Sequence, residues 1–272
     1  YKRSFGNDGP PGCYEDLEKA DTVMLIGANV ADNHPILVQR LIRNREHNPR
    51  HKLVVVDPRA TKTAMMADLF LAVRPRADVH LLNGLAKLVI DEGWADQRYV
   101  EKNTEGYEAL CAQISHYSLE YTAKVTGLTE GQIYETAKAI GQARSATLAW
   151  TMGVNHSTQG AETVNAICNL ALLTGNVGIE GGTALSITGQ CNAMGSREAS
   201  FTSSLPGYRK FESAEHRREL AEIWKIDPEK IPSSRGPAYP DIIEAILEGK
   251  IKGLWVIATN PLVSYPDQGR LR

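Results

Sequence analysis

Glycine, amide, carboxylate and guanidinium groups follow three short apolar runs of this sequence. The first run ends in IGANVADNHP, where Gly27 permits close backbone approach and Asn29 can form hydrogen bonds. The second ends in DPRAT, where Asp57 can accept hydrogen bonds from a ribose or a guanine edge. The third ends in RPRAD, whose two arginines add positive charge. Although G-x-G-x-x-G is absent, these groups together favour a nucleotide site. Taken singly, Gly27 and Pro58 could equally shape turns, and Asp57 could cap a helix.

Two later stretches also carry chemically versatile side chains. NHSTQG (155–160) contains His156, but other histidines are distant in sequence, which favours a hydrogen-bonding group over a metal ligand. ITGQCNAMGSREASFTSS (187–204) contains Arg197, whose planar guanidinium matches two oxygens of an anion. An ion pair of Arg197 with Glu198 or another carboxylate is the alternative. No residue of the chain is expected to ligate a metal.

The elements that must position these groups are strands and helices in alternation. Short apolar runs at 21–27, 52–57 and 69–73 are typical of strands buried on both faces. Apolar spacing predicts a helix after the first strand and another over 78–93, with Asp78 as its cap. This βαβαβ order predicts a parallel sheet. Ligands of such sheets bind beyond the carboxyl ends of the strands.

The remainder of the chain predicts a helical excursion and then a second α/β unit. Residues 94–144 have helical spacing, with Thr129 and Gln132 in a capping-box pattern. We expect a first dinucleotide-binding domain at 1–145 and a second, incomplete α/β unit at 146–272. The second unit should contain these elements: a strand at 146–154, a helix at 161–176, a long irregular segment at 183–240 with one short helix near 214–225, a helix at 241–249 and a buried strand at 253–261.

Composition excludes several classes of protein. The 272 residues carry 30 Lys and Arg against 32 Asp and Glu, a net charge of −2, and 42% are hydrophobic. That balance argues against disorder and against a nucleic-acid-binding stripe. The sequence has no apolar run long enough to cross a membrane and no visible export signal, so we expect a cytoplasmic protein. Its four cysteines are far apart, which favours reduced thiols over a disulfide scaffold.

The order of these segments resembles one enzyme family over almost the whole chain. The segments are IGANVADNHP, VVVDPRAT, RPRAD, WTMGVNHSTQG, NLALLTGNVG, ITGQCNAMGSREAS, LPGYRKFE and ATNPLVSYPD. They are similar to the central region of the oxidoreductases that bind molybdenum through two molybdopterin guanine dinucleotides. GQCNAMGSREA and LPGYRKFE resemble the assimilatory nitrate reductases more than the formate dehydrogenases.

The resemblance implies two doubly wound, Rossmann-like α/β units, each holding one pterin guanine dinucleotide, with molybdenum between them. The positions that match cofactor-binding segments are Ile26, Gly27, Ala28, Asn29, Val30, Ala31, Asp32, Asn33, Asp57, Pro58, Arg59, Ala60, Thr61, Arg76, Ala77, Asp78, Met152, His156 and Asn260. Relatives often have Gln at position 156 and Gly at position 200, where this chain has Ser200. Asn260 matches a contact to the other cofactor half.

The resemblance also implies a reaction: reduction of nitrate to nitrite by oxygen-atom transfer at the molybdenum centre. Gln190 and Arg197 match the substrate funnel, where Arg197 would steer and hold nitrate. Electrons would arrive through a [4Fe-4S] cluster from an undetermined donor, such as ferredoxin, flavodoxin or an NADH-linked subunit. The cysteines that bind this cluster and the molybdenum lie outside the matched region, and Cys13 comes too late to be the molybdenum ligand. We therefore expect a central fragment without turnover of its own.

Three alternatives remain open at this point. The parent enzyme could be a formate dehydrogenase, which uses the same cofactor on a different substrate. It could be a periplasmic nitrate reductase, which an export signal in the full gene would reveal. The chain could also be a noncatalytic cofactor-binding or assembly module.

Overall fold

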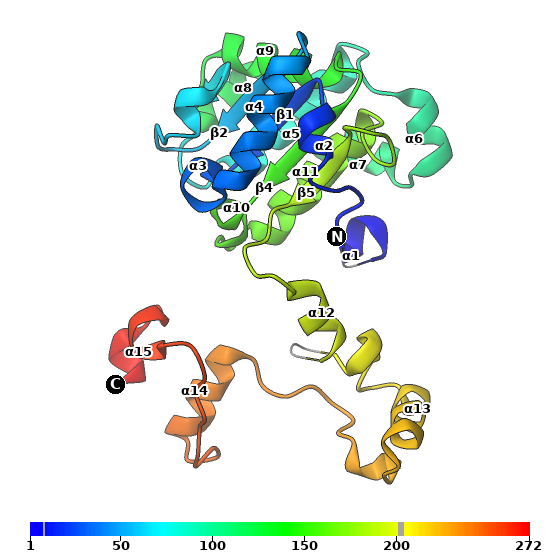
Figure 1. Ribbon diagram of the computed structural model, residues 1–272, viewed down its shortest axis with the longest axis vertical. Coiled ribbons are helices and arrows are strands. Elements are labelled where there is room, and N and C mark those ends of the chain that lie inside the picture. Colours follow the sequence, from blue (N-terminus) through cyan, green and yellow to red (C-terminus); the bar gives the residue numbers. More distant parts are fainter. Residues whose placement is uncertain (8, 201–203) are drawn as a thin grey trace. The chain divides into compact units, whose positions relative to one another are not determined.

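The apolar runs predicted as strands lie side by side in a parallel sheet of the computed structural model, which describes residues 1–7, 9–200 and 204–272 (Figure 1). The strands are β1 (Thr22–Ile26), β2 (Lys52–Val56), β3 (Leu69–Leu71), β4 (Ala146–Trp150) and β5 (Thr183–Ser186). Their order is β3-β2-β1-β4-β5, and every pairing is parallel. The predicted α/β class with a mainly parallel sheet is confirmed.

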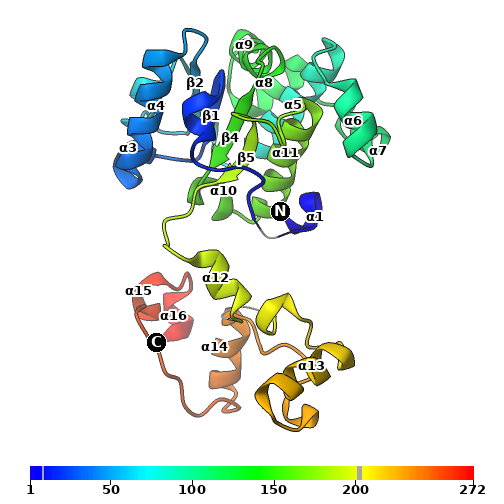
Figure 2. The same cartoon turned by 45° about the vertical axis from the view of Figure 1, so that its right-hand side comes forward.

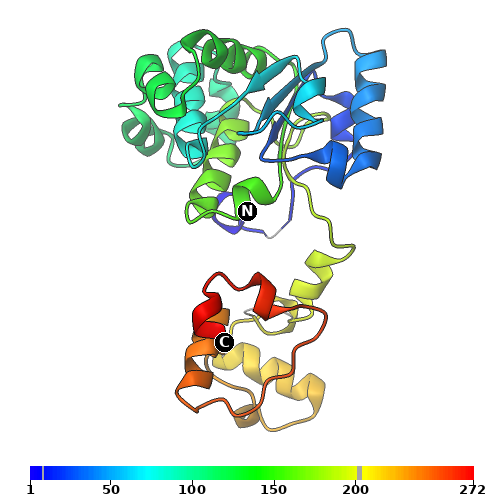
Figure 3. The same ribbon diagram turned by 90° about the vertical axis from the view of Figure 1, so that its left-hand side faces the viewer.

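Helices cover both faces of this sheet (Figure 3). On β1, Val23 and Leu25 pack with residues of α2 and α4, whereas Met24 and Ile26 pack with residues of α5, α9 and α11. Alternate residues of a strand point to opposite faces, so a strand covered on both sides must be apolar throughout. The helices of this region are α1 (Lys2–Phe5), α2 (Asp16–Lys19), α3 (Val30–Asn33), α4 (Pro35–His47), η1 (Ala64–Met66), α5 (Asp78–Asp91), α6 (Gln97–Asn103), α7 (Tyr107–Ile114), α8 (Leu119–Thr126), α9 (Glu130–Gly141), α10 (Met152–Asn155) and α11 (Gly160–Leu173).

The helical excursion between β3 and β4 is confirmed, since residues 97–141 form α6 to α9 (Figure 2). The predicted capping box starts α9: the Gln132 backbone N–H donates to Thr129 Oγ1 at 3.2 Å, and the Thr129 N–H donates to Gln132 Oε1 at 3.0 Å. These bonds satisfy amide donors that the first turn of a helix leaves free. None of the described helices has the length and apolar run needed to cross a bilayer.

The chain divides at a different place from the predicted boundary at 145/146. The described residues form two compact units, Tyr1–Cys191 and Asn192–Arg272. The strand at 146–150 belongs to the first unit because β4 pairs with β1, from Thr22↔Ala146 to Ile26↔Trp150. Residues 183–186, expected in an irregular segment, form β5 on the far side of β4. The periodicity of single strands cannot reveal which sheet they join.

The second unit is built from short helices. They are α12 (Ala193–Glu198), η2 (Pro206–Tyr208), α13 (Ala214–Trp224), η3 (Pro228–Lys230), α14 (Tyr239–Leu247), α15 (Pro261–Ser264) and α16 (Gln268–Leu271). Helices were predicted near 214–225 and 241–249, and both are confirmed. Leu205, Leu220, Ala221 and Ile231 form a small buried cluster.

The strand predicted at 253–261 is absent from the described part of this unit, and the prediction is wrong for these residues. Leu254 is 53% exposed, Trp255 87% and Ile257 66%. Residues 192–200 and 204–272 contain no strand, so this segment has no sheet neighbour within its unit to take up its backbone hydrogen bonds. A second sheet is therefore not formed by these residues.

Candidate functional site

The carboxyl ends of all five strands lie in one row. The pairs Leu71↔Val56, Val56↔Ile26, Ile26↔Trp150 and Trp150↔Ser186 join the last residue of each strand to that of its neighbour. The predicted segments 26–33, 57–61 and 152–156 start at or just beyond this row, and 76–78 ends the connection from β3 to α5. We call this rim of the first unit the carboxyl edge.

A contact between two glycines crosses the middle of the carboxyl edge. Gly27 has φ +54°, and its carbonyl accepts hydrogen bonds from Thr151 Oγ1 at 2.7 Å and from the Gly153 N–H at 3.1 Å. A Cβ on Gly27 would lie 2.8 Å from the Gly153 Cα, and one on Gly153 would lie 2.6 Å from the Gly27 Cα. Both positions therefore exclude side chains. We call Gly27, Thr151 and Gly153 the glycine clasp.

The glycine clasp lies where the order of the strands reverses. The chain moves outward from β1 to β2 and β3, then returns to place β4 on the other side of β1. In doubly wound sheets ligands bind at this switch point, outside the carboxyl ends of the strands. Sequence reasoning identified Gly27 but missed Thr151 and Gly153. The available signal was a second glycine, Gly153, near the end of the strand predicted at 146–154.

A hydrogen-bond network ties the loop after β1 to the loop after β2. Thr63 Oγ1 donates to Asn29 Oδ1 at 2.8 Å and accepts from the Ala31 N–H at 2.9 Å. Asn29 Nδ2 donates to Asp32 Oδ2 at 2.7 Å. The Asn29 amide, which was predicted to face a ligand, thus orders the loop through both of its polar atoms. Thr63, only 1% exposed, was missed by sequence reasoning because nothing in its local pattern marks it.

Asp32 continues this network at the surface. Its carboxylate forms an ion pair with Lys62 at 2.7 Å. The Lys62 ammonium, followed by the Asn29 amide, lowers the pKa of Asp32 below its ordinary value. Both side chains are exposed, so solvent screens the pair and its effect on stability is small. Its consequence is local: Asp32 stays ionised, and its charge is compensated.

Two carboxylates, Asp57 and Asp78, lie within electrostatic reach of each other on the carboxyl edge. Asp57 is 5% exposed, and its Oδ1 accepts a hydrogen bond from the Arg59 N–H at 2.8 Å. Burial raises the pKa of the Asp78 carboxyl, and the negative charge of Asp57 raises it further. Asp78 is the first residue of α5 rather than its predicted cap, since Ala77 holds the cap position.

Cations are also available on the carboxyl edge. The Arg59 side chain is 75% exposed. Arg76 is exposed and has φ 70°, a left-handed conformation that costs a residue with a Cβ about 1 kcal/mol. Arg74 instead contacts the end of α8, where its Nη1 donates a hydrogen bond to the Lys124 carbonyl at 2.8 Å. The edge therefore combines a buried carboxylate, Asp57, and a half-buried one, Asp78, with exposed guanidinium groups.

The loop after β4 brings Met152 and His156 to the same edge. Met152 begins α10 and His156 follows its last residue, with the His156 N–H donating to the Met152 carbonyl at 2.8 Å. Both side chains are exposed, Met152 by 46%. His34, which precedes α4, has both ring nitrogens buried without a hydrogen-bond partner among the described residues. An unpaired buried nitrogen is costly, so His34 is suited to an additional polar group.

Three predicted site residues, Gln190, Arg197 and Asn260, lie outside the segments that form the carboxyl edge. Gln190 is exposed close to the end of the first unit. Arg197 lies in the last turn of α12, and Asn260 precedes α15, both in the second unit. Ser200 has φ 79°, the left-handed conformation that favours glycine. Ser200 thus adopts a backbone conformation that is typical of glycine.

The sequence matches the molybdopterin oxidoreductase family over residues 8–272. The chain belongs to the molybdopterin oxidoreductase family. It is 42% identical over 273 residues to a nitrate reductase of Synechocystis sp., covering 100% of this chain and 38% of that relative. It is 36% identical over 267 residues to an assimilatory nitrate reductase of Haloferax mediterranei, covering 98% of this chain and 36% of that one. The chain thus spans well under half the length of these relatives.

Other relatives in the molybdopterin oxidoreductase family have different activities. An F420-dependent formate dehydrogenase subunit alpha of Methanocaldococcus jannaschii is 36% identical over 265 residues, covering 97% of this chain and 38% of that one. Among solved structures, the acetylene hydratase of Pelobacter acetylenicus matches with a TM-score of 0.57 and 24% identity, covering 63% of this chain and 25% of the other. This structural likeness bears on the fold alone.

The family implies a molybdenum-pterin cofactor, and the residues of the carboxyl edge fit such a group. The glycine clasp forms the middle of the edge from main chain alone, because the backbone of each glycine fills the space that a Cβ on the other would take. His34 offers unpaired ring nitrogens, and the exposed guanidinium groups suit phosphates. Asp57 and Asp78 suit hydroxyl or amino donors.

Proposed function

We propose that this chain is the central cofactor-binding part of a nitrate reductase and that its carboxyl edge holds a molybdopterin guanine dinucleotide. The observation that carries this proposal is the glycine clasp at the switch point of the sheet, with Asp57 after β2 and Asp78 after β3 on the same edge. Nitrate reductase relatives, including an assimilatory one, support the substrate. In this proposal a second dinucleotide-binding domain of the whole enzyme holds the other pterin, with Asn260 among its contacts.

Each group of the carboxyl edge has a distinct task in this proposal. Asp57 and Asp78 accept hydrogen bonds from guanine or ribose donors. The glycine clasp fixes the loops after β1 and β4, on which the pyrophosphate would lie. Arg59 and Arg76 compensate phosphate charge. The loops 26–33 and 57–61 also contribute backbone contacts, and Met152 and His156 close the site from the β4 side.

The bound cofactor supplies the two-electron reduction of nitrate to nitrite by oxygen-atom transfer. This chain binds and orients the substrate: Arg197 holds nitrate through its guanidinium fork, and Gln190 donates a hydrogen bond from the funnel wall. In the whole cytoplasmic enzyme, electrons arrive through a [4Fe-4S] cluster from ferredoxin, flavodoxin or an NADH-linked subunit. The formate dehydrogenase relative makes formate oxidation the second candidate function. Assays of the enzyme with nitrate and with formate distinguish the two.

The site itself is tested by measuring the guanine nucleotide bound to the purified enzyme. Acid hydrolysis of the pterin guanine dinucleotide releases GMP, which can be counted per chain. We expect Asp57→Ala and Asp78→Asn to lower the GMP content about tenfold, since each removes a charged hydrogen-bond acceptor. Asp91→Asn is the matched control, because Asp91 ends the same helix that Asp78 begins and is exposed in an ion pair with Lys87. Unchanged GMP content in both edge variants would contradict the proposed site.

A further inference from the structure

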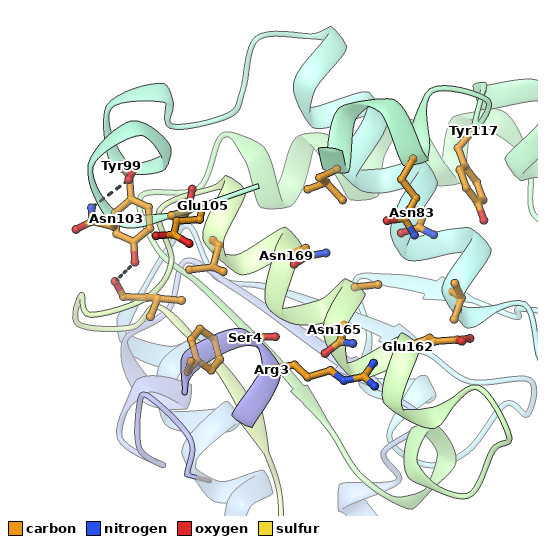
Figure 4. A pocket seen from close by; sticks show the side chains of 18 of the residues that line it. Arg3, Ser4, Asn83, Tyr99, Asn103, Glu105, Tyr117, Glu162, Asn165 and Asn169 are labelled. Atoms are coloured by element: carbon orange, nitrogen blue, oxygen red, sulfur yellow. Dashed lines mark hydrogen bonds between the residues drawn. The ribbon is translucent and has the colours of Figure 1, made fainter. Parts of the chain in front are cut away.

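A large polar groove lies on the helical side of the first unit, outside the groups assigned to the cofactor. Its volume is about 1240 Å³, and its walls come from α1, α5, α6, α7 and α11 (Figure 4). Side chains from these helices project toward it, among them Asn83, Asn165 and Asn169. We call this cavity the amide groove. No sequence pattern pointed to it, because its walls come from five separate helices.

One wall of the amide groove is a polar stripe along α11. Gln159, Glu162, Asn165 and Asn169 are spaced by three, three and four residues, which places them on one face of a helix. The opposite face of α11 is buried in the core through Ile167 and Cys168. At 1.5 Å per residue the stripe is about 15 Å long. The polar wall of the groove is therefore long enough to contact an elongated ligand.

The floor of the amide groove contains buried polar groups without partners. Asn83, on α5, is 8% exposed, and its carboxamide forms no hydrogen bond with a described residue. Nδ1 of His80, one turn earlier, is also buried without a partner among the described residues. Leaving the buried His80 nitrogen unpaired costs about 1–3 kcal/mol. A ligand that hydrogen-bonds to this nitrogen would recover that energy.

The groups lining the amide groove match a peptide better than a phosphate or a metal. A carboxamide presents one acceptor and one donor, the same pair as a peptide group. Arg3 and Lys102 are cations without an ion pair to a described residue, but Glu162 and Glu105 bring anions into the same cavity and oppose a polyphosphate. The volume exceeds that of most small-molecule sites, about 300–1,000 Å³.

We propose that the amide groove binds an extended polypeptide segment of about five residues, supplied by the same enzyme from outside residues 1–272. This inference rests on the proposed function, in which the chain is part of a longer enzyme, and on the relatives, of which the chain spans 38% or less in the nitrate reductases named above. A mainly polar groove gives a free peptide little apolar burial. A tethered segment is present at an effective concentration of about 1 mM, which compensates for a weak intrinsic affinity.

The test measures thiol reactivity in the purified enzyme. Asn169→Cys on α11 and Lys102→Cys on the opposite wall probe the groove, and Gln39→Cys, exposed on α4, is the matched control. Labelling by N-ethylmaleimide is followed site by site by mass spectrometry, with urea-unfolded enzyme as the reference. We expect both groove cysteines to react about tenfold more slowly than the control, since a bound segment must leave before the reagent enters. Using two sites keeps the test valid if one variant fails to fold.

The source of the segment is identified with a short thiol-anchored photo-cross-linker on the same cysteines. The proposal expects a cross-linked peptide from the same enzyme, outside residues 1–272. Fast labelling, a cross-link to another protein, or protection without a cross-link within the enzyme would each overturn it. An intact mass of the enzyme near the 29.8 kDa of this chain would also overturn it. Nitrate and formate assays on the same preparation show separately whether the proposed reaction fails.

Discussion

Two equally apolar stretches of this chain have opposite environments. TVMLI (22–26) forms β1, and every residue is buried between β2 and β4 and beneath helices on both faces. GLWVIA (253–258) forms no strand, and its Trp255 is 87% exposed. The comparison teaches that an apolar run becomes a strand only where neighbours satisfy its backbone and layers cover both faces. The first unit gives β1 neighbouring strands for its backbone and helices over both faces. The described part of the second unit gives residues 253–258 neither neighbouring strands nor such cover.

Truncating the buried strand should produce the largest effect. Leu25→Ala removes a side chain that is 1% exposed and leaves a cavity between β1 and the helices above it. We expect the free energy of unfolding of the first unit to fall by about 3 kcal/mol. Urea denaturation followed by circular dichroism measures this change. A loss below about 1 kcal/mol would show that the core around β1 is not closely packed.

Disturbing the glycine clasp should have the next largest effect. Gly153→Ala places a Cβ 2.6 Å from the Gly27 backbone, so the loops after β1 and β4 must separate. We expect a loss of about 2 kcal/mol in unfolding free energy, together with a lower GMP content of the enzyme.

Gly131→Ala is the control for the clasp variant, because nothing lies within 4 Å of a Cβ at this position on α9. It should instead increase the unfolding free energy by about 1 kcal/mol, the difference in helix propensity. Equal effects of the two substitutions would contradict a special role for the clasp.

Asp21, a buried carboxylate at the amino end of β1, makes a pH-dependent contribution to the free energy of unfolding. The Arg144 guanidinium donates to both Asp21 oxygens, at 2.8 and 2.7 Å, and lowers the pKa of Asp21 to about 2. Because the folded pKa is below the unfolded value, this stabilisation is complete above about pH 4 and is lost as pH falls toward 2. Asp21→Asn should cost about 2 kcal/mol at pH 7.

The pH series also separates this pair from surface charges. The loss caused by Asp21→Asn should shrink steadily between pH 4 and pH 2, as measured by urea denaturation across the series. The exposed pair of Lys87 and Asp91 should change the unfolding free energy by less than about 0.5 kcal/mol when Asp91 becomes Asn. If Asp21→Asn lowered the free energy of unfolding by the same amount at every pH, the charge of Asp21 would not be the source of its stabilising effect.

The smallest effect is expected in the exposed apolar stretch. Ile257 is 66% exposed, so Ile257→Ala should change the unfolding free energy of this chain by less than about 0.5 kcal/mol. The same measurement on Leu25→Ala gives the contrast directly. A cost comparable to that of Leu25→Ala would mean that residues 253–258 are covered by neighbours after all.

Much of the candidate site followed from local patterns. Gly27, Asp57 and Asp78 were predicted because a residue after a buried parallel strand must lie on the carboxyl edge, whatever the rest of the fold. The capping box at Thr129 and Gln132 was equally local. Thr63, Thr151 and Gly153 were missed because their significance comes from partners 34, 124 and 126 positions away in Asn29 and Gly27. No short-range pattern records such partners.

The sequence alone determined the class of the fold, the helical excursion and the family, since periodicity and motif order are properties of the chain itself. Only the tertiary structure decided that β4 and β5 join the sheet of β1, that 253–258 stays uncovered, and that an amide groove exists. Each of these depends on pairing or packing between distant residues. Backbone hydrogen bonds and apolar burial are gained only when such partners meet, and a linear pattern does not specify which partners they are.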